Sequence, residues 1–126
     1  MEKLSTAEMN YLLTIENQGE SARLSDISKD LQVTKASVFG MLERLEKKGL
    51  VHKEKKVTLT EAGKKVVSEA HAILNWMKHH LVDKCGVPEE IANEDSIKVI
   101  CSLSDVTREK AAEVFAKSGL YGNCNG

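Results

Sequence analysis

The stretch that decides the fold runs from Val33 to Gly63 and reads VTKASVFGMLERLEKKGLVHKEKKVTLTEAG. Its first half has apolar residues at helical spacing, namely Val38, Met41, Leu42 and Leu45. Gly49 can end this helix in the left-handed conformation. Two short runs follow, Leu50 to Lys53 and Val57 to Thr60, separated by a charged turn. Their alternating apolar and polar residues predict a small β-hairpin.

Two further helices are predicted before this stretch. The first has apolar residues at Met9, Leu12, Leu13 and Ile15, with Ser5 or Thr6 as its cap and Gly19 as its end. The second, LSDISKDL, should be capped by Ser25 and should turn Leu24, Ile27 and Leu31 inward. Only Gln32 and Val33 separate it from the third helix. Two helices joined by so short a turn form a helix-turn-helix, and the hairpin adds a wing.

The rest of the chain is predicted to be helical. Thr60 should cap a long helix that ends at Gly86, and Pro88 should begin a short one. Asn93 and Ser104 are expected to cap two more helices, the last of which ends at Gly119. The long helix has more apolar residues than a small wing can cover, so we expect the excess to pack against the following helices and a second subunit. These apolar residues are Val66, Val67, Ala70, Ile73, Leu74, Trp76, Met77 and Leu81.

The predicted fold is therefore mainly α. Residues 1–62 form an N-terminal winged helix-turn-helix DNA-binding domain with a small β-hairpin wing. Residues 63–120 form an all-helical dimerisation domain, and residues 121–126 form a flexible tail.

Composition narrows the class of protein. Hydrophobic residues make up 41% of the chain and charged residues 29%, as in a globular protein. No apolar run reaches the roughly 20 residues that cross a membrane, and the first residues lack a signal-peptide core, so we expect a cytoplasmic protein. Cys85, Cys101 and Cys124 suggest no disulfide framework. Without a phosphate-binding glycine loop, a nucleophile elbow or an HExxH motif, the sequence does not indicate an enzyme.

The charge distribution favours double-stranded DNA as the partner. Ten lysines and arginines accompany five acidic residues between Lys29 and Lys65, although the whole chain has a net charge of −1. The N-terminal end of the third helix should contact base edges in the major groove, and the basic hairpin turn should contact phosphates. The candidate DNA-binding residues are Thr34, Lys35, Ala36, Ser37, Gly40, Arg44, His52, Lys53, Lys55 and Lys56. The alternative is a winged helix that dimerises but contacts another protein and does not read DNA specifically.

From Tyr11 to about Val114 the chain resembles the metal-dependent transcriptional repressors, the iron- and manganese-responsive family of the diphtheria toxin repressor and the manganese transport regulator. The resemblance rests on the segments VTKASV, LEKKGLV and LTEAG and on the histidine-bearing helix that follows them. It implies a cytoplasmic homodimeric repressor on a palindromic operator, with Fe(II) or Mn(II) as corepressor. The hairpin is slightly shorter than is usual in that family, and the chain corresponds to a short form without the family's SH3-like domain.

Most metal-ligand positions of that family hold different residues here. His71 and Cys101 can bind a metal, whereas the other family positions hold Asn10, Leu13, Asn75, Asn93, Ile97 and Ile100. Mn(II) and Fe(II) prefer several oxygen and imidazole ligands, so this set argues against both metals. A softer site with Zn(II) or Cu(I) would use His71 and Cys101, with His79, His80 or Cys85 recruited. The alternatives are a polar stripe with Cys101 as a small buried residue, or Cys101 as a redox-sensing thiol.

Overall fold

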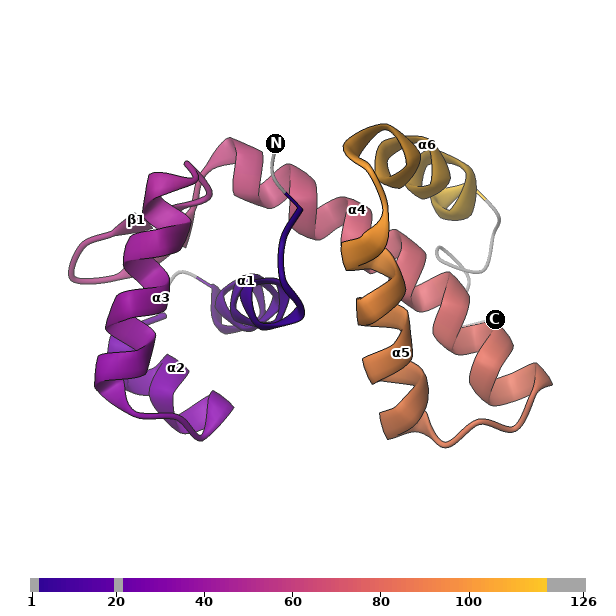
Figure 1. The fold of residues 1–126 in the computed structure, drawn as a ribbon, viewed down its shortest axis with the longest axis horizontal. Helices are drawn as coiled ribbons and strands as arrows, with labels where there is room; N and C mark the ends of the chain where they lie inside the picture. Colours follow the sequence, from indigo (N-terminus) through magenta and orange to yellow (C-terminus); the bar gives the residue numbers. More distant parts are fainter. Residues whose placement is uncertain (1–2, 20–21, 118–126) are drawn as a thin grey trace. The chain divides into compact units, whose positions relative to one another are not determined.

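The computed structural model describes residues 3–19 and 22–117 of the chain, which form two compact units. One unit holds residues 7–67, and the other holds residues 3–6 and 68–117 of the described chain. The helices and strands, drawn in Figure 1, are α1 (Thr6–Gln18), α2 (Leu24–Leu31), α3 (Lys35–Lys47), β1 (Val51–Lys53), β2 (Val57–Leu59), α4 (Glu61–Lys78), α5 (Glu89–Ser102) and α6 (Asp105–Ala116). The predicted fold class, mainly α with an N-terminal winged helix-turn-helix, is confirmed. Cys124, the expected end at Gly119 and the predicted tail at 121–126 lie outside the described residues.

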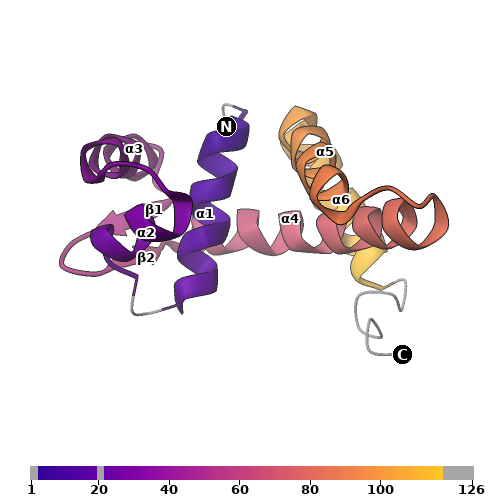
Figure 2. The same cartoon turned by 90° about the horizontal axis from the view of Figure 1, so that it is seen from below.

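The first unit is built around the helix-turn-helix of α2 and α3, which lies beside α1 (Figure 2). Ile27 is fully buried, while Leu24 and Leu31 are half-buried. The prediction that Ser25 caps α2 is wrong. Arg23 occupies the N-cap position in an extended conformation, and no side chain caps the helix there. The helix thus begins one residue before Ser25 and includes it.

The turn between α2 and α3 depends on a left-handed residue. Gln32 has φ 56°, and its N–H donates to the Lys29 carbonyl O at 3.3 Å. The Val33 N–H donates to the Ser28 carbonyl O at 3.1 Å, and the Ser28 hydroxyl donates to the Val33 carbonyl O at 2.6 Å. The two backbone bonds satisfy carbonyl groups in the last turn of α2, and the chain enters α3 after three residues, Gln32 to Thr34.

A threonine side chain caps the start of α3. The Thr34 Oγ1 accepts a hydrogen bond from the Ser37 N–H at 3.1 Å, which makes Thr34 the N-cap. The apolar face of the helix is buried through Val38, Leu42 and Leu45, with Met41 half-buried. Gly49, at φ 76°, follows the helix in the left-handed region, as expected.

The wing consists of β1, β2 and the turn that joins them. The strands are antiparallel and pair Val51 with Leu59 and Lys53 with Val57. On its other side, β2 is held by a hydrogen bond from the Val57 N–H to the Ala22 carbonyl O at 2.8 Å. The wing is therefore fixed to the segment that leads into α2.

Thr60 and Gly63 join the wing to α4. The Thr60 hydroxyl donates to the Gly49 carbonyl O at 2.6 Å and accepts from the Gly63 N–H at 3.0 Å, so the predicted cap is confirmed. Gly63 lies directly against the backbone of Leu50, where a Cβ would overlap the carbonyl O. In the LTEAG segment, Thr60 therefore caps α4, and Gly63 allows α4 to pack closely against Leu50.

The second unit contains most of α4 together with α5 and α6. After Lys78 the long helix continues as a π-helical segment, His79–Lys84, and Gly86, at φ 73°, follows it. The prediction that Asn93 caps a separate helix is wrong, because α5 runs without a break from Glu89 to Ser102. Pro88 is the N-cap of α5 and not its first residue. The cap of α6 is confirmed, since the Ser104 Oγ accepts from the Thr107 N–H at 3.2 Å.

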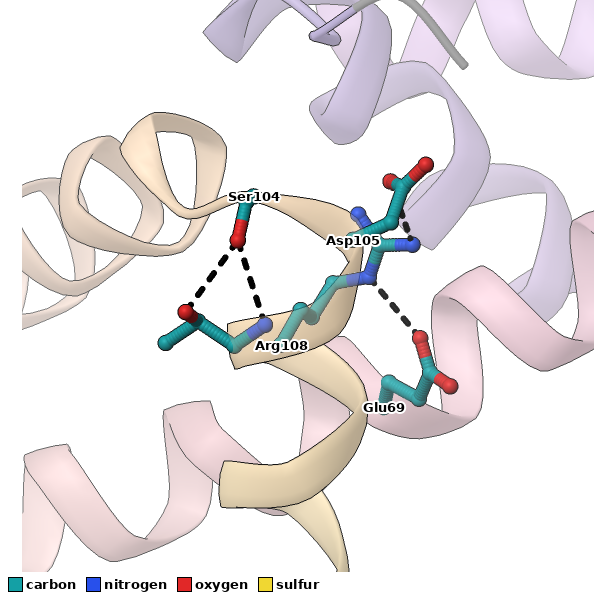
Figure 3. A network of polar contacts seen from close by, with 5 residues as sticks. Glu69, Ser104, Asp105 and Arg108 are labelled. Atoms are coloured by element: carbon teal, nitrogen blue, oxygen red, sulfur yellow. Dashed lines mark hydrogen bonds and ion pairs between the residues drawn. The ribbon is translucent and has the colours of Figure 1, made fainter.

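A buried ion pair and an aromatic stack connect α4 to α6. Figure 3 shows Arg108 between two carboxylates: its Nε lies 2.8 Å from Glu69 Oε1 and its Nη2 3.1 Å from Asp105 Oδ1. Arg108 and Glu69 are both buried, so each stabilises the other charge away from water. Trp76 stacks on Phe115 with ring centroids 4.2 Å apart. These contacts fix α6 on the α4 helix.

Candidate nucleic-acid interface

The candidate DNA-binding residues outside the wing lie at the N-cap of α3 and on its exposed face. They are all exposed in the structure: Thr34, Lys35, Ala36, Ser37, Gly40 and Arg44. Because the Thr34 hydroxyl donates to the Ser37 Oγ at 2.9 Å, the Ser37 hydroxyl keeps its own proton for an outside acceptor. Thr34 is largely committed to capping the helix, whereas Ser37 and Lys35 offer donors to an outside ligand.

Gly40 leaves open space beside the helix. A Cβ built at this position meets no atom within 4 Å, and Gly40 has no positive φ. Neither packing nor backbone conformation therefore requires glycine here, although glycine inside a helix costs about 1 kcal/mol relative to alanine. Its absent side chain lowers the surface of α3 between Ala36 and Arg44.

Arg44 is tied to a buried carboxylate within its own unit. Its Nη2 lies 3.5 Å from Oε2 of Glu8, and the Lys48 Nζ lies 2.7 Å from the same oxygen. The Glu8 side chain is almost fully buried, so the close lysine partner stabilises its charge. These pairs connect the C-terminal part of α3 to α1. Arg44 itself remains more than half exposed, which leaves its other guanidinium donors accessible.

The wing presents the other predicted residues next to α3. His52, Lys55 and Lys56 are exposed, whereas Lys53 is half-buried. The Lys53 N–H donates to Oε2 of Glu46 on α3 at 3.2 Å. Two exposed lysines in a turn beside an exposed helix face form a basic surface that suits the phosphates of duplex DNA.

Sequence reasoning missed two residues, Phe39 on this surface and the buried Glu8 that pairs with Arg44. The Lys53 Nζ lies 3.8 Å from the centre of the Phe39 ring, and 46% of Phe39 is exposed. Phe39 stands outside the apolar stripe of α3, which was a signal that it does not belong to the core. Glu8 carried no sequence signal, because its partners are 36 and 40 positions away in the chain.

The expected metal-ligand positions do not fit a manganese or iron site. Ile97 and Ile100 are 4% and 1% exposed, and their side chains offer no ligand atom. The Cys101 thiol donates to the Ser5 carbonyl O at 3.6 Å, and His71 is half-buried. Within residues 3–19 and 22–117, no three His, Cys, Asp or Glu side chains are grouped so that they could hold a metal ion. Among the other family positions, Asn75 and Asn10 are exposed, and Leu13 and Asn93 are half-buried.

Comparison with known proteins identifies the class to which this chain belongs. Residues 4–58 match the MarR family. The chain is 32% identical over 108 residues to the uncharacterized HTH-type transcriptional regulator MJ0568 of Methanocaldococcus jannaschii, covering 82% of this chain and 83% of that protein. The chain belongs to the HTH-type transcriptional regulators. It is therefore a DNA-binding transcriptional regulator.

Solved structures extend the similarity beyond the first unit to the helical unit, which contains most of α4 together with α5 and α6. The hypothetical protein SSo2273 from Sulfolobus solfataricus has a TM-score of 0.66 and 30% identity, with 92% of each chain covered. The manganese regulator SloR has a TM-score of 0.68 and 20% identity, covering 85% of this chain and 52% of SloR. At that identity the SloR comparison shows a shared fold alone. None of the helices in the described ranges has the length and apolar character needed to cross a membrane.

Proposed function

We propose that the regulator is a homodimeric repressor that binds a palindromic operator in the cytoplasm. The N-terminal half of α3 enters the major groove, and Lys55 and Lys56 of the wing contact the flanking phosphates. The observation that supports this most directly is that the donors of α3 and the lysines of the wing belong to one compact unit. Base readout and phosphate binding can therefore act together.

We further propose that binding does not require Mn(II) or Fe(II). The family resemblance would place ligands at Ile97 and Ile100, and both side chains are buried hydrocarbons. The experiment is a fluorescence anisotropy titration of the metal-stripped regulator against DNA from its own promoter region, with and without Mn(II), Fe(II), Zn(II) and Cu(I). Equal affinity under all conditions is expected. Binding that appears only with one metal would contradict metal independence.

The double variant Lys35→Ala with Ser37→Ala tests the DNA interface itself. Both side chains are exposed, so the variant should stay folded while operator affinity falls by about tenfold or more, as expected when one good base contact of at least about 1.4 kcal/mol is lost. The same anisotropy titration measures the affinity, and circular dichroism checks the fold.

A matched control removes the same two residue types elsewhere. Lys98→Ala with Ser102→Ala changes exposed residues of α5 and should leave operator affinity unchanged. Equal affinities for both double variants would argue against the assigned interface. Binding that is weak and does not fall with added salt would instead favour a winged helix that contacts a protein.

A further inference from the structure

Phe39 is an exposed aromatic residue at the middle of the helix that we assign to the major groove. Phe39 as a whole is 46% exposed, while the core face of α3 is formed by Val38, Leu42 and Leu45. A single exposed apolar residue is ordinary in a soluble protein. Phe39 differs from such a residue in its surroundings, because its exposed neighbours Ala36 and Gly40 are small. The ring therefore stands out from the part of α3 that has the least side-chain bulk.

The ring is held in place from one side by the wing. The Lys53 Nζ lies 3.8 Å from the ring centre, within the range of a cation–π contact. The Lys53 backbone is in turn fixed to α3 by the hydrogen bond from its N–H to Glu46. One contact to the Phe39 side chain thus comes from a strand whose own position is anchored, so the ring is oriented before any ligand arrives.

We propose that Phe39 is a specificity-determining residue that recognises the C5-methyl group of thymine. This proposal rests on the proposed function, since it requires α3 to lie in the major groove. Among the four bases, only thymine presents a methyl group there, and an apolar side chain is the partner that suits it. Phe39 is the only large apolar side chain with substantial exposure among residues 35–47 of α3, all of which the structure describes. Lys53, on the covered side of the ring, carries its charge to the neighbouring phosphate.

The test compares duplexes that differ only in the C5-methyl group of a single thymine. Duplexes are selected by the wild-type regulator from a random-sequence library, and each thymine of the selected site is then replaced in turn by deoxyuridine. Removing one buried methyl group should weaken wild-type binding about fourfold at the position that Phe39 contacts. The variant Phe39→Ala should bind the thymine and uracil duplexes at that position equally well. Because wild-type protein gives the first half of the result, the test does not depend on how well the variant folds.

A second variant, at Lys53, separates recognition of the base by Phe39 from the contribution of the Lys53 charge to binding. Lys53→Met keeps most of the aliphatic stem and removes the charge, so it should weaken binding to thymine and uracil duplexes by the same factor. The proposal is overturned if no replacement by deoxyuridine weakens wild-type binding, or if Phe39→Ala still distinguishes the two duplexes. In either case salt-sensitive wild-type binding to the selected duplex would leave the proposed function intact. If the library yields no enriched sequence, the proposed function and this inference fail together.

Discussion

Neither the packing nor the backbone conformation of α3 requires a glycine at Gly40. The space beside it is open and its backbone is ordinary helix, so Gly40→Ala should raise the free energy of unfolding by about 1 kcal/mol. In the groove, however, the added methyl group would stand between α3 and the base edges, and operator affinity should fall by about tenfold, or about 1.4 kcal/mol. Urea unfolding and anisotropy titration measure the two effects. An alanine variant that is more stable and binds equally well would remove close approach as the reason for this glycine.

The same substitution at Gly63 should lower the free energy of unfolding instead of raising it. A Cβ at this position would overlap the Leu50 carbonyl O and also lie 3.4 Å from the Leu59 Cβ. Either α4 or the chain before the wing must move, and overpacking of this kind costs about 1 to 3 kcal/mol. The midpoint of urea unfolding of Gly63→Ala should therefore shift downward. An unchanged midpoint would mean that the contact between α4 and Leu50 relaxes without cost.

At the scale of elements, the wing is expected to supply affinity and not sequence specificity. Replacing Lys55 and Lys56 by alanine should weaken binding to every duplex by a similar factor, because both side chains are exposed in the turn and would face phosphates. The slope of log affinity against log salt concentration should become shallower by about 1 for each lysine. Titrations at several salt concentrations on a selected and a scrambled duplex measure this. The control is Lys98→Ala with Lys110→Ala, two exposed lysines of the helical unit, which should leave the slope unchanged.

The elements also show where sequence reasoning succeeded and where it failed. Thr60 and Ser104 were predicted as caps, and each accepts the expected backbone N–H. Ser25 and Asn93 have the same chemistry but lie inside helices. A residue's type indicates that it can cap a helix, whereas packing decides where the helix begins.

Two longer-range effects explain these errors. The segment before α2 is fixed by its hydrogen bond to β2, so the helix can begin before Ser25. Near Asn93, the buried residues Ala92, Ser96, Ile97 and Ile100 keep one continuous face of α5 packed through the expected break. The contact between Lys53 and Phe39 joins two elements through side-chain geometry, which a periodic pattern does not encode.

At the scale of the whole molecule, we expect a dimer. The helical unit leaves several large apolar side chains exposed, namely Ile91, Val99, Val106 and Val114. Sedimentation equilibrium should give twice the chain mass of 13.9 kDa at micromolar concentration. Two-fold symmetry would space the α3 helices about 34 Å apart, or a multiple of it, so the half-sites should be separated by whole turns of DNA. Inserting half a turn between the half-sites should abolish tight binding. A monomer that tolerates this insertion would contradict the expectation.

The two buried isoleucines of α5 make it difficult for a metal site to evolve at their positions. Ile97 and Ile100 are almost completely buried. A mutation that introduced a carboxylate at either position would first place an unpaired charge in that interior, at a cost of several kcal/mol, before any metal could compensate for it. A domain of ordinary stability has only about 5 to 15 kcal/mol in total, so selection would remove such intermediates. Descendants of this chain are therefore more free to acquire an effector site elsewhere than to acquire a metal site at these two positions.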